Sequence, residues 1–358
     1  MRTVRGAFAT LLLALLISAG PAQSSGLVPV GGPLLGGRGT VVPEGAPTLP
    51  RTTAAGWLVA DLDTGQVLAS HDAHGRYAPA STLKTLTAET LIPQLDPSMR
   101  VRPTFDDLNV DGSKVGLVQA LAYPVSELFT AMLVVSGNDA ANTLATANGG
   151  VAKTVTEMNA EAGRLQAFDT HAVNTSGLDD PHQLSSAYDL ALIARAGMKL
   201  PAFRDYVRIK RAQIAGPGGK PIPISSHDRL LWNYPGAIGI KNGYTVRARA
   251  TFVGAATRDG HTLVVTLMKT EPRYWPEAAA LLDWGFAAER SKVAPVGQLV
   301  EPDPDESQLL SAPRDLVTMP PPGRTIAFVS ISRDSLLIVG AFAAGLLFLV
   351  VRRRLRPR

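Results

Sequence analysis

The order of strand-like and helix-like segments is the feature that most constrains how this chain of 358 residues can fold. Two short apolar runs within 57–70 flank Asp63-Thr64-Gly65, a pattern that predicts a β-hairpin. From about residue 81 to residue 200 the apolar residues recur with a helical period, and strand patterns return over 237–269. A last helix is expected at about 275–286. Strands on both sides of a helical block predict an α+β domain whose single sheet is completed from both ends.

Several individual elements can be placed in this region, and no internal repeat is present. In the helical block we expect helices at 81–91, 126–135, 139–147, 151–165 and 185–196. In the second β region we expect strands at 237–241, 250–257 and 262–269.

Most of the positive charge lies at the ends of the chain. The formal net charge is +5, but seven arginines lie in the first five and last seven residues, so residues 6–351 carry a net charge of −2. A slightly negative net charge over residues 6–351 gives no support for nucleic-acid binding. The absence of cysteine excludes disulfides, thiolate catalysis and cysteine-ligated metals. The six histidines show no metal-ligand spacing, so we expect no metal and no other cofactor.

Residues 1–22 have the pattern of a secretory signal peptide. Two arginines precede an apolar run at 11–17 that is too short to span a bilayer, and small residues follow at 20 and 22 with the spacing that cleavage requires. A retained membrane anchor is the alternative interpretation. The Gly/Pro-rich segment 23–50 is expected to be flexible.

The C-terminal region predicts a spacer and a membrane anchor. Residues 291–334 are rich in proline and partly acidic, which is typical of an extended spacer. Residues 335–351 carry no charge and are just long enough for a transmembrane helix, although a buried core helix is the alternative. The arginine-rich tail 352–358 would then be cytoplasmic. These segments place a folded domain at 51–290 outside the cell, attached to the cell membrane by one C-terminal helix.

Ser81-Thr82-Leu83-Lys84 is the first motif that can carry chemistry. Positions i and i+3 share a helix face, so the Ser81 hydroxyl and the Lys84 amine can approach each other. A lysine with a lowered pKa can remove the serine proton and produce a nucleophile. Ser81 near a helix start also places backbone N–H groups where an oxyanion could be held. Taken alone, the motif is expected about once by chance in a chain of this length, and Ser81 alone could be a helix N-cap.

Two later motifs offer complementary groups. Ser136-Gly137-Asn138 follows an apolar helical run, where Ser136 could relay a proton to a leaving amine and Asn138 could hold a substrate amide. Lys241-Asn242-Gly243-Tyr244-Thr245 follows an apolar strand, where the lysine could attract a substrate carboxylate. Gly243 could let a ligand backbone lie against the strand, and Thr245 could donate its hydroxyl. Ordinary turn residues are the alternative for both motifs.

Together these motifs resemble a known superfamily. S-x-x-K, S-x-N and K-x-G follow one another with gaps of 55 and 105 residues, as in penicillin-binding proteins and serine β-lactamases. Over about 51–290 the chain most resembles the low-molecular-mass D-alanyl-D-alanine carboxypeptidases, serine peptidase family S11. The similar segments are the Asp61–Gly65 hairpin, PASTLK, SGNDAAN, Asn174–Leu178 with His182, SSAYDLALIAR, GIKNGYT and LLDWGF.

The resemblance implies a fold and an activity. The fold is β-lactamase/transpeptidase-like, with a central antiparallel sheet flanked by helices and an all-helical subregion. The activity is removal of the terminal D-alanine from peptidoglycan stem peptides, and β-lactams would be covalent inhibitors. The implied catalytic groups are Ser81 as nucleophile, Lys84 as general base, Ser136 as proton relay and the backbone N–H of Tyr244 beside that of Ser81 as oxyanion hole. The implied substrate-binding residues are Asn138, Lys241, Asn242, Gly243 and Thr245.

One departure from the family pattern concerns the third motif. The family usually has threonine where this chain has Asn242, and that threonine hydroxyl helps to bind the substrate carboxylate. Asn242 can still donate a hydrogen bond, and Thr245 could share the role. A second departure is that the region between the domain and the anchor is too short and too rich in proline for the small β domain that related enzymes often carry.

Two other functions use the same motifs. A class A β-lactamase needs a glutamate that activates the deacylating water, and the corresponding position here is Ala172. A non-catalytic wall-binding protein on the same fold is the other alternative, although a pure binder has no need of Lys84 beside Ser81. Transpeptidase and endopeptidase preferences stay open at this point.

Overall fold

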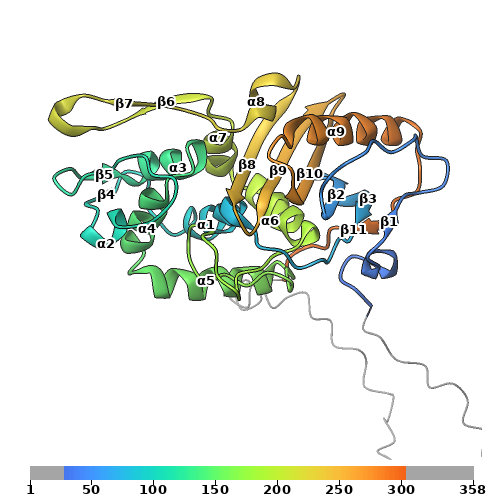
Figure 1. Ribbon diagram of the computed structural model, residues 1–358, viewed down its shortest axis with the longest axis horizontal. Helices are drawn as coiled ribbons and strands as arrows, with labels where there is room; N and C mark the ends of the chain where they lie inside the picture. Colours follow the sequence, from blue (N-terminus) through green and yellow to red (C-terminus); the bar gives the residue numbers. More distant parts are fainter. Residues whose placement is uncertain (1–27, 304–358) are drawn as a thin grey trace, which may run out of the picture. The chain divides into compact units, whose positions relative to one another are not determined.

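The computed structural model describes residues 28–303, and its centre is a seven-stranded antiparallel sheet (Figure 1). The strands lie in the order β1-β3-β2-β10-β9-β8, and β11 pairs with β3. The strands are β1 (Thr40–Val41), β2 (Gly56–Asp61), β3 (Gln66–His71), β8 (Ala237–Thr245), β9 (Arg249–Arg258), β10 (His261–Thr270) and β11 (Gly297–Gln298). Because β2 pairs with β10, the N-terminal hairpin and the C-terminal strands form one sheet, as the sequence predicts.

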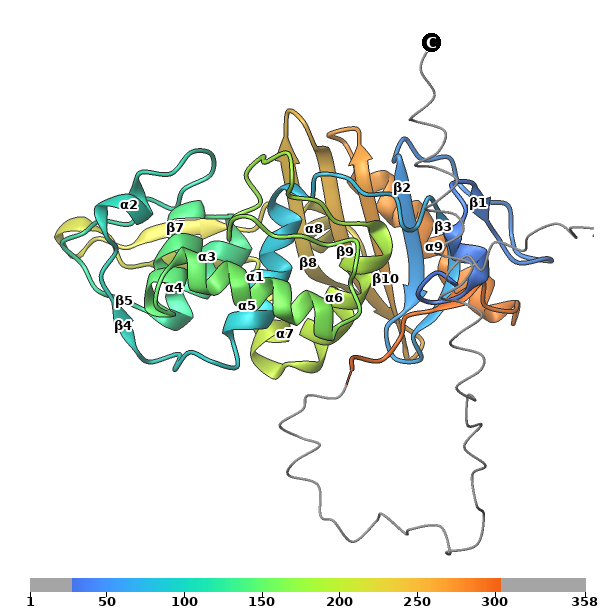
Figure 2. The same cartoon turned by 90° about the horizontal axis from the view of Figure 1, so that it is seen from below.

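Helices form the rest of the domain. The α-helices are α1 (Lys84–Leu91), α2 (Phe105–Leu108), α3 (Val125–Val134), α4 (Asn138–Ala147), α5 (Val151–Arg164), α6 (Ala187–Lys199), α7 (Pro201–Val207), α8 (Arg229–Asn233) and α9 (Trp275–Arg290). Short 3₁₀ turns are η1 (Pro33–Gly36), η2 (Ala80–Leu83) and η3 (Pro217–Gly219). Figure 2 shows α2 to α5 gathered beside the sheet, which is the all-helical subregion that we expected.

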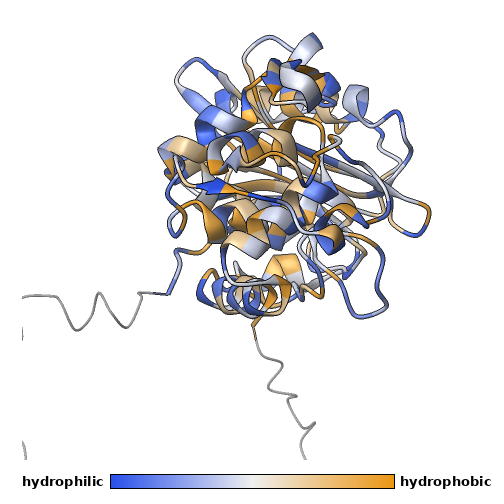
Figure 3. Ribbon diagram, turned by 90° about the vertical axis from the view of Figure 1, so that its left-hand side faces the viewer, coloured by the Kyte–Doolittle hydropathy of each residue, from blue (hydrophilic) through white to orange (hydrophobic). Residues whose placement is uncertain are grey.

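The sheet separates two apolar clusters. Along β10, Val264 and Met268 belong to the cluster shared with α6, whereas Val265 and Leu267 belong to the cluster shared with α9. Successive side chains of a strand point to opposite faces, so one strand contributes to both clusters. Figure 3 shows apolar and polar residues interspersed along the helices that cover the sheet. The sheet is therefore buried on both faces.

Residues 200–236 contain elements that the sequence pattern did not reveal. Here α7 is followed by a two-stranded sheet of β6 (Arg211–Ile214) and β7 (Ile222–Ser225), and then by α8. A second small sheet, β4 (Arg100–Val101) with β5 (Tyr123–Pro124), was also not expected. These strands have only two to four residues, too few to show a period.

Parts of the N-terminal segment are packed on the domain, so the expectation of a flexible segment over 23–50 does not hold for Leu35 and β1. Thr40 and Val41 pair with the edge strand β3, and Leu35 is buried. The His74 ring, through Nε2, makes a 3.1 Å hydrogen bond with the Val30 carbonyl. A Gly/Pro-rich composition predicted flexibility, but the edge of the sheet supplies backbone hydrogen-bond partners for this segment.

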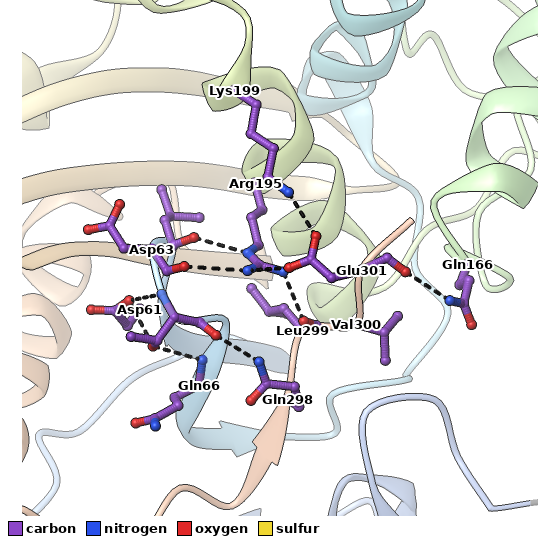
Figure 4. Close-up of polar contacts among 12 residues, drawn as sticks. Asp61, Asp63, Gln66, Gln166, Arg195, Lys199, Gln298, Leu299, Val300 and Glu301 are labelled. Atoms are coloured by element: carbon purple, nitrogen blue, oxygen red, sulfur yellow. Dashed lines mark hydrogen bonds and ion pairs between the residues drawn. The ribbon is translucent and has the colours of Figure 1, made fainter. Parts of the chain in front are cut away.

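The C-terminal boundary also lies farther along the chain than the predicted residue 290. Leu299 is fully buried, and its N–H donates to the Gly65 carbonyl at 2.7 Å. Arg195 of α6 donates to the carbonyls of Leu62 and Leu299 and pairs with Glu301 at 2.7 Å (Figure 4). The first part of the expected spacer is thus held against the sheet by the pairing of β11 with β3 and by the buried Arg195.

No helix within the described residues is long and apolar enough to cross a membrane. The expected signal peptide at 1–22, the transmembrane helix at 335–351 and the basic tail at 352–358 lie outside the described residues, as does the expected spacer beyond residue 303.

Candidate active site

Ser81 and Lys84 lie together at the start of the helical region. Ser81 is in η2, and Lys84 is the first residue of α1. Lys84 Nζ lies within hydrogen-bond distance of Ser81 Oγ, at 3.0 Å. The i, i+3 spacing predicted this approach. In a 3₁₀ turn, residues three apart lie directly above one another, and this geometry brings Lys84 Nζ to Ser81 Oγ.

Lys84 is completely buried and has three hydrogen-bond partners. Besides Ser81 Oγ, its Nζ donates to Asn138 Oδ1 at 2.7 Å and to the Ser176 carbonyl at 2.5 Å. Burial and repulsion from Lys241 lower the pKa of Lys84 well below its ordinary value, and attraction to Asp139 opposes part of this shift. A lysine in this environment can lie neutral beside a serine and accept its proton.

The backbone around Ser81 is held in an unusual conformation. Ala80 has φ +48, which is rare for a residue with a Cβ. The Pro79 carbonyl accepts hydrogen bonds from the hydroxyls of Thr82 and Thr251. Gly177 lies so close that an added Cβ would be 1.9 Å from the Ala80 carbonyl oxygen. These neighbours from three parts of the chain fix the position of Ser81.

The second motif forms the turn between α3 and α4. Ser136 has φ +63 and is buried, and Asn138 begins α4. The Asn138 side chain makes two hydrogen bonds: its Oδ1 accepts from Lys84, and its Nδ2 donates to the Asp111 carbonyl at 2.6 Å. Asn138 therefore holds Lys84, a role that the sequence did not suggest, and its second Nδ2 hydrogen has no acceptor within residues 28–303, so the predicted contact with a substrate amide stays a prediction.

Lys241 lies inside β8 rather than at the end of a strand. It is buried, and burial lowers its pKa to about 7 despite the attraction of Asp228. Its Nζ donates to the Asn242 carbonyl at 2.7 Å. Within residues 28–303 it makes no hydrogen bond with the predicted proton relay Ser136.

Gly243 lies where β8 comes close to the segment that carries Ser81. A Cβ on Gly243 would lie 2.6 Å from the Ser81 backbone nitrogen and 2.6 Å from Thr251 Oγ1. The glycine thus lets β8 approach the nucleophile segment, where the sequence suggested space for a ligand. Tyr244 follows with an exposed side chain. Its backbone N–H comes from the strand that approaches Ser81, as the oxyanion-hole prediction requires.

The two remaining predicted residues of β8 differ in whether their side chains already make hydrogen bonds within the protein. The Thr245 hydroxyl donates to Asp179 Oδ1 at 2.7 Å and accepts from the Ala248 N–H, so it is already engaged. The Asn242 side chain is partly exposed and makes no hydrogen bond within the described part of the chain. Of the two candidates for binding a substrate carboxylate, Asn242 has the free donor.

Several supporting residues were not identified from the sequence. Asp139 accepts hydrogen bonds from the N–H groups of Val115, Gly116 and Leu117 and so holds the loop beside the second motif. The Ser176 carbonyl binds Lys84 from a loop 92 residues away. The Asn174–Leu178 segment belongs to the family resemblance, but only the folded chain shows that it contacts Lys84.

Histidine spacing indicated no metal site, whereas the fold brings histidines and acids together in two groups. The groups are Asp61, His261 and Glu289, and His74, Asp169 and Asp189. In the first, Asp61 accepts two hydrogen bonds from Thr64. In the second, His74 pairs with Asp169 at 2.7 Å. We assign these contacts to the packing of the domain and derive no chemistry from them.

Comparisons with known proteins agree with this geometry. The sequence profile of the D-alanyl-D-alanine carboxypeptidase family, Peptidase S11, matches residues 44–271. The chain is 44% identical to D-alanyl-D-alanine carboxypeptidase DacB2 of Mycobacterium tuberculosis over 69% of this chain and 87% of that protein.

Solved structures give the same result. A crystal structure of a D-alanyl-D-alanine carboxypeptidase from Mycobacterium tuberculosis has a TM-score of 0.68 and 42% identity, covering 73% of this chain and 99% of that one. The Streptomyces K15 DD-transpeptidase has a TM-score of 0.64 and 28% identity, covering 67% and 100%. The β-lactamase/transpeptidase-like α+β fold is thereby confirmed, and the chain belongs to the D-alanyl-D-alanine carboxypeptidase family S11 of serine peptidases.

Proposed function

We propose that this protein removes the terminal D-alanine from peptidoglycan stem peptides through an acyl-enzyme on Ser81. The observation that carries the proposal is the 3.0 Å contact between Ser81 Oγ and the buried Lys84 Nζ, whose pKa is lowered. Membership of the carboxypeptidase family supports the substrate class.

Acylation would begin with neutral Lys84. Its amine accepts the Ser81 proton while Oγ attacks the carbonyl carbon between the two D-alanines. The developing oxyanion is bound by the backbone N–H groups of Ser81 and Tyr244. Ser136 then gives a proton to the departing D-alanine, with the positive charge of Lys241 nearby.

The terminal carboxylate of the substrate would bind at β8. Lys241 supplies positive charge, and the Asn242 amide supplies a free hydrogen-bond donor. Since the Thr245 hydroxyl donates to Asp179, it takes part only if that bond is exchanged for one to the substrate.

Water would finally hydrolyse the acyl-enzyme. Ala172 stands where the β-lactamase pattern has its water-activating glutamate, and its N–H binds Asn159 Oδ1. A carboxylate at that position is therefore missing, which favours a slowly hydrolysed β-lactam adduct over β-lactamase turnover. The buried Lys84 beside Ser81 also argues against a purely wall-binding protein, because binding alone does not require a lysine in so unfavourable an environment.

The same proposal includes the location of the enzyme. The signal-peptide pattern at 1–22 and the uncharged segment at 335–351 before the arginine tail support a catalytic domain outside the cell, attached to the membrane at its C-terminus. Protease protection of the tail in sealed cells, together with release of the domain on removal of residues 335–358, would test this arrangement.

Product analysis on a defined pentapeptide ending in D-Ala-D-Ala is the decisive experiment. We expect release of one D-alanine, and after penicillin treatment a mass increase that maps to Ser81. Ser81→Ala should remain folded and lose both reactions. Active, folded protein without an adduct on Ser81 would contradict the mechanism, and rapid turnover of a chromogenic cephalosporin would favour a β-lactamase.

A further inference from the structure

The group formed by Asp61, His261 and Glu289 contains contacts that go beyond the packing bonds of Asp61 with Thr64. His261 Nδ1 lies 3.5 Å from Asp61 Oδ2 and 3.4 Å from Glu289 Oε2. Both distances exceed the usual length of an N–H···O hydrogen bond, about 2.7–3.2 Å. The bonds with Thr64 use the other carboxylate oxygen of Asp61, Oδ1. The histidine is therefore farther from both acids than direct hydrogen bonding requires.

The fold brings these three side chains to one face of the sheet. Asp61 ends β2 and is paired with Leu263 of β10. His261 lies two residues before Leu263, so both side chains are on the same face. Helix α9 lies against this face (Figure 1), since a Cβ on Gly285 would be 2.8 Å from Leu263. Glu289 follows Gly285 by one turn of α9 and thus reaches the other two side chains.

The two carboxylates are placed unfavourably unless a cation joins them. The Asp61 side chain is only 2% exposed, and Glu289 Oε2 is buried without a hydrogen-bond partner. Glu289 also lies in the last turn of α9, where the helix dipole disfavours negative charge. Burial and the neighbouring Asp61 carboxyl raise the pKa of Glu289 to about 7, although the charge of His261 opposes this shift. Within residues 28–303, His261 is the only ion-pair partner of either acid.

The spacing of the three ligand atoms fits a zinc ion. Zn²⁺ binds histidine nitrogen and carboxylate oxygen at about 2.0–2.2 Å, with its ligands in a tetrahedron. Two ligand atoms of such a site are then about 3.4 Å apart. The observed distances from His261 Nδ1 are 3.4 and 3.5 Å, and all three atoms lie within 4.8 Å of one another. Ca²⁺ would instead need about six to eight oxygen ligands, and an imidazole nitrogen favours zinc.

Two further properties of metal sites are present in this group. Carboxylates that bind a metal are usually oriented by hydrogen bonds to their other atoms. Asp61 Oδ1 accepts such bonds from the Thr64 N–H at 2.6 Å and from the Thr64 hydroxyl at 2.9 Å. A metal also needs an entry path, and the His261 side chain is 55% exposed. Water can therefore supply the fourth ligand from the solvent side.

The other group of a histidine and two acids lacks this geometry. His74 Nδ1 lies 2.7 Å from Asp169 Oδ2, and its Nε2 lies 3.1 Å from the Val30 carbonyl oxygen. Both ring nitrogens of His74 thus already have hydrogen-bond partners. A metal ligand needs a free nitrogen, so this second group does not qualify.

We propose that Asp61, His261 and Glu289 form a zinc-binding site, in which the metal joins the end of β2, the start of β10 and the last turn of α9. Zinc bound there would stabilise the domain by connecting three elements that are distant in sequence. The ion would also compensate the two carboxylates that the fold places together.

This site goes beyond the proposed function, because it is separate from the Ser81 chemistry. Through β10, Asp61 is in register with Ala256 of β9. Thr251, whose hydroxyl binds the Pro79 carbonyl next to the nucleophile segment, lies five residues away along β9. Five residues of a strand span about 17 Å. We therefore expect the zinc ion to affect stability and to leave acylation unchanged.

Titration of the metal-free full chain with zinc chloride tests the site. The protein is first treated with a chelator, which is then removed. Calorimetry should show one Zn²⁺ bound per chain at this site, and zinc at about 100 times its Kd should raise the thermal midpoint by about 5 °C or more. The same concentration of Mg²⁺ or Ca²⁺ should not raise it. The rate of penicillin acylation should be the same with and without zinc.

Variants locate the bound ion. His261→Gln and Glu289→Gln should each weaken zinc binding by more than about tenfold, since loss of a hydrogen-bond partner of a metal ligand already has that effect. Without zinc, Glu289→Gln should be at least as stable as the wild type, because it removes the repulsion between two buried acids. A purely structural contact between histidine and acids predicts the reverse: a less stable variant and no effect of zinc. The matched control His171→Gln removes an exposed histidine outside both groups and should keep the zinc response.

Three results would overturn the zinc site. They are a wild type that binds no zinc, an equal stabilisation by Mg²⁺ or Ca²⁺, and zinc binding that is unchanged in the folded variants, because the ion would then bind elsewhere. Should Glu289→Gln not fold, His261→Gln decides alone, since that side chain is largely exposed. Release of D-alanine and the penicillin adduct on Ser81 test the proposed function independently of all these results.

Discussion

Lys84 is the residue whose surroundings matter most for the chemistry. Its pKa is lowered by burial and by Lys241, while Asp139 opposes part of that change. Only the neutral amine can take the Ser81 proton. Activity should therefore be present at neutral pH and fall on the acid side, as Lys84 gains a proton.

A pH profile of acylation tests this assignment. The second-order rate of penicillin acylation should rise with pH and reach its plateau well below pH 10.5, the ordinary lysine value. Lys84→Arg places a permanently charged group at this position that cannot accept a proton, so the rate should fall by about 10²- to 10⁴-fold. An unchanged thermal midpoint would show that the fold is intact. A wild-type rate in Lys84→Arg would refute the general-base role.

Asn242 provides a second test at the residue scale. Its amide is the free donor beside Lys241, so Asn242→Ala should raise KM for a peptide with a terminal carboxylate by roughly tenfold, the value of about one hydrogen bond to a charged group. The kcat should change little. Asn242→Thr, which restores the usual family residue, should stay close to the wild type. Steady-state kinetics measure both, and a loss confined to kcat would contradict a binding role.

At the scale of elements, the site depends on contacts between segments that are distant in sequence. The loop at Gly177 and the strand at Gly243 both press against the Ala80–Ser81 peptide. In both places a side chain would collide with backbone atoms. The nucleophile is thus positioned by the absence of two Cβ atoms as much as by hydrogen bonds.

Gly177→Ala should therefore damage the site and the fold. Gly177 has φ +86, and its new Cβ would meet the Ala80 carbonyl oxygen at 1.9 Å. We expect a loss of about 2 kcal/mol or more in the free energy of unfolding, with strongly reduced penicillin acylation. Gly163→Ala is the matched control, because it lies in α5 with open space around it, and should change stability by less than about 1 kcal/mol. Urea unfolding measures both variants; equal stability would refute the close-contact argument.

Long periodic segments were the elements that could be predicted best. The hairpin of β2 and β3, helices α3 to α5 and strands β9 and β10 lie within two residues of their expected limits. By contrast, β8 continues through Lys241 to Thr245, whereas the strand was expected to end at residue 241. The polar residues there resemble a turn in sequence, but pairing with β9 extends the strand.

At the scale of the whole molecule, both end segments of the described region complete the sheet. β1 pairs with the C-terminal end of β3 and β11 with its N-terminal end, and Arg195 binds the C-terminal segment. A domain cut at the predicted residue 290 would expose the apolar side chains that pack against Val296 and Leu299. It would also remove the Leu299 carbonyl and the Glu301 carboxylate from Arg195, which would keep only the Leu62 and Asp63 carbonyls.

A truncation series tests this boundary. Residues 28–303 should fold and be acylated by penicillin like the full chain. Residues 28–290 should be less stable by roughly 2–5 kcal/mol, the usual effect of removing one large buried side chain. Thermal unfolding and acylation measure the difference. Equal thermal midpoints for the two truncations would show that the segment after residue 290 does not belong to the folded domain.

The sequence by itself determined the fold class, the order of the main elements and the approach of Ser81 to Lys84, because these depend on local periodicity and on spacing along one turn of helix. Tertiary structure alone decided what each group is free to do. In the folded chain the Asn138 side chain is hydrogen-bonded to Lys84 and Asp111, and the Thr245 hydroxyl is hydrogen-bonded to Asp179. The Asn242 side chain makes no hydrogen bond within residues 28–303 and can bind a substrate. Such assignments depend on which distant backbone atoms come within hydrogen-bond distance, and no local pattern encodes that.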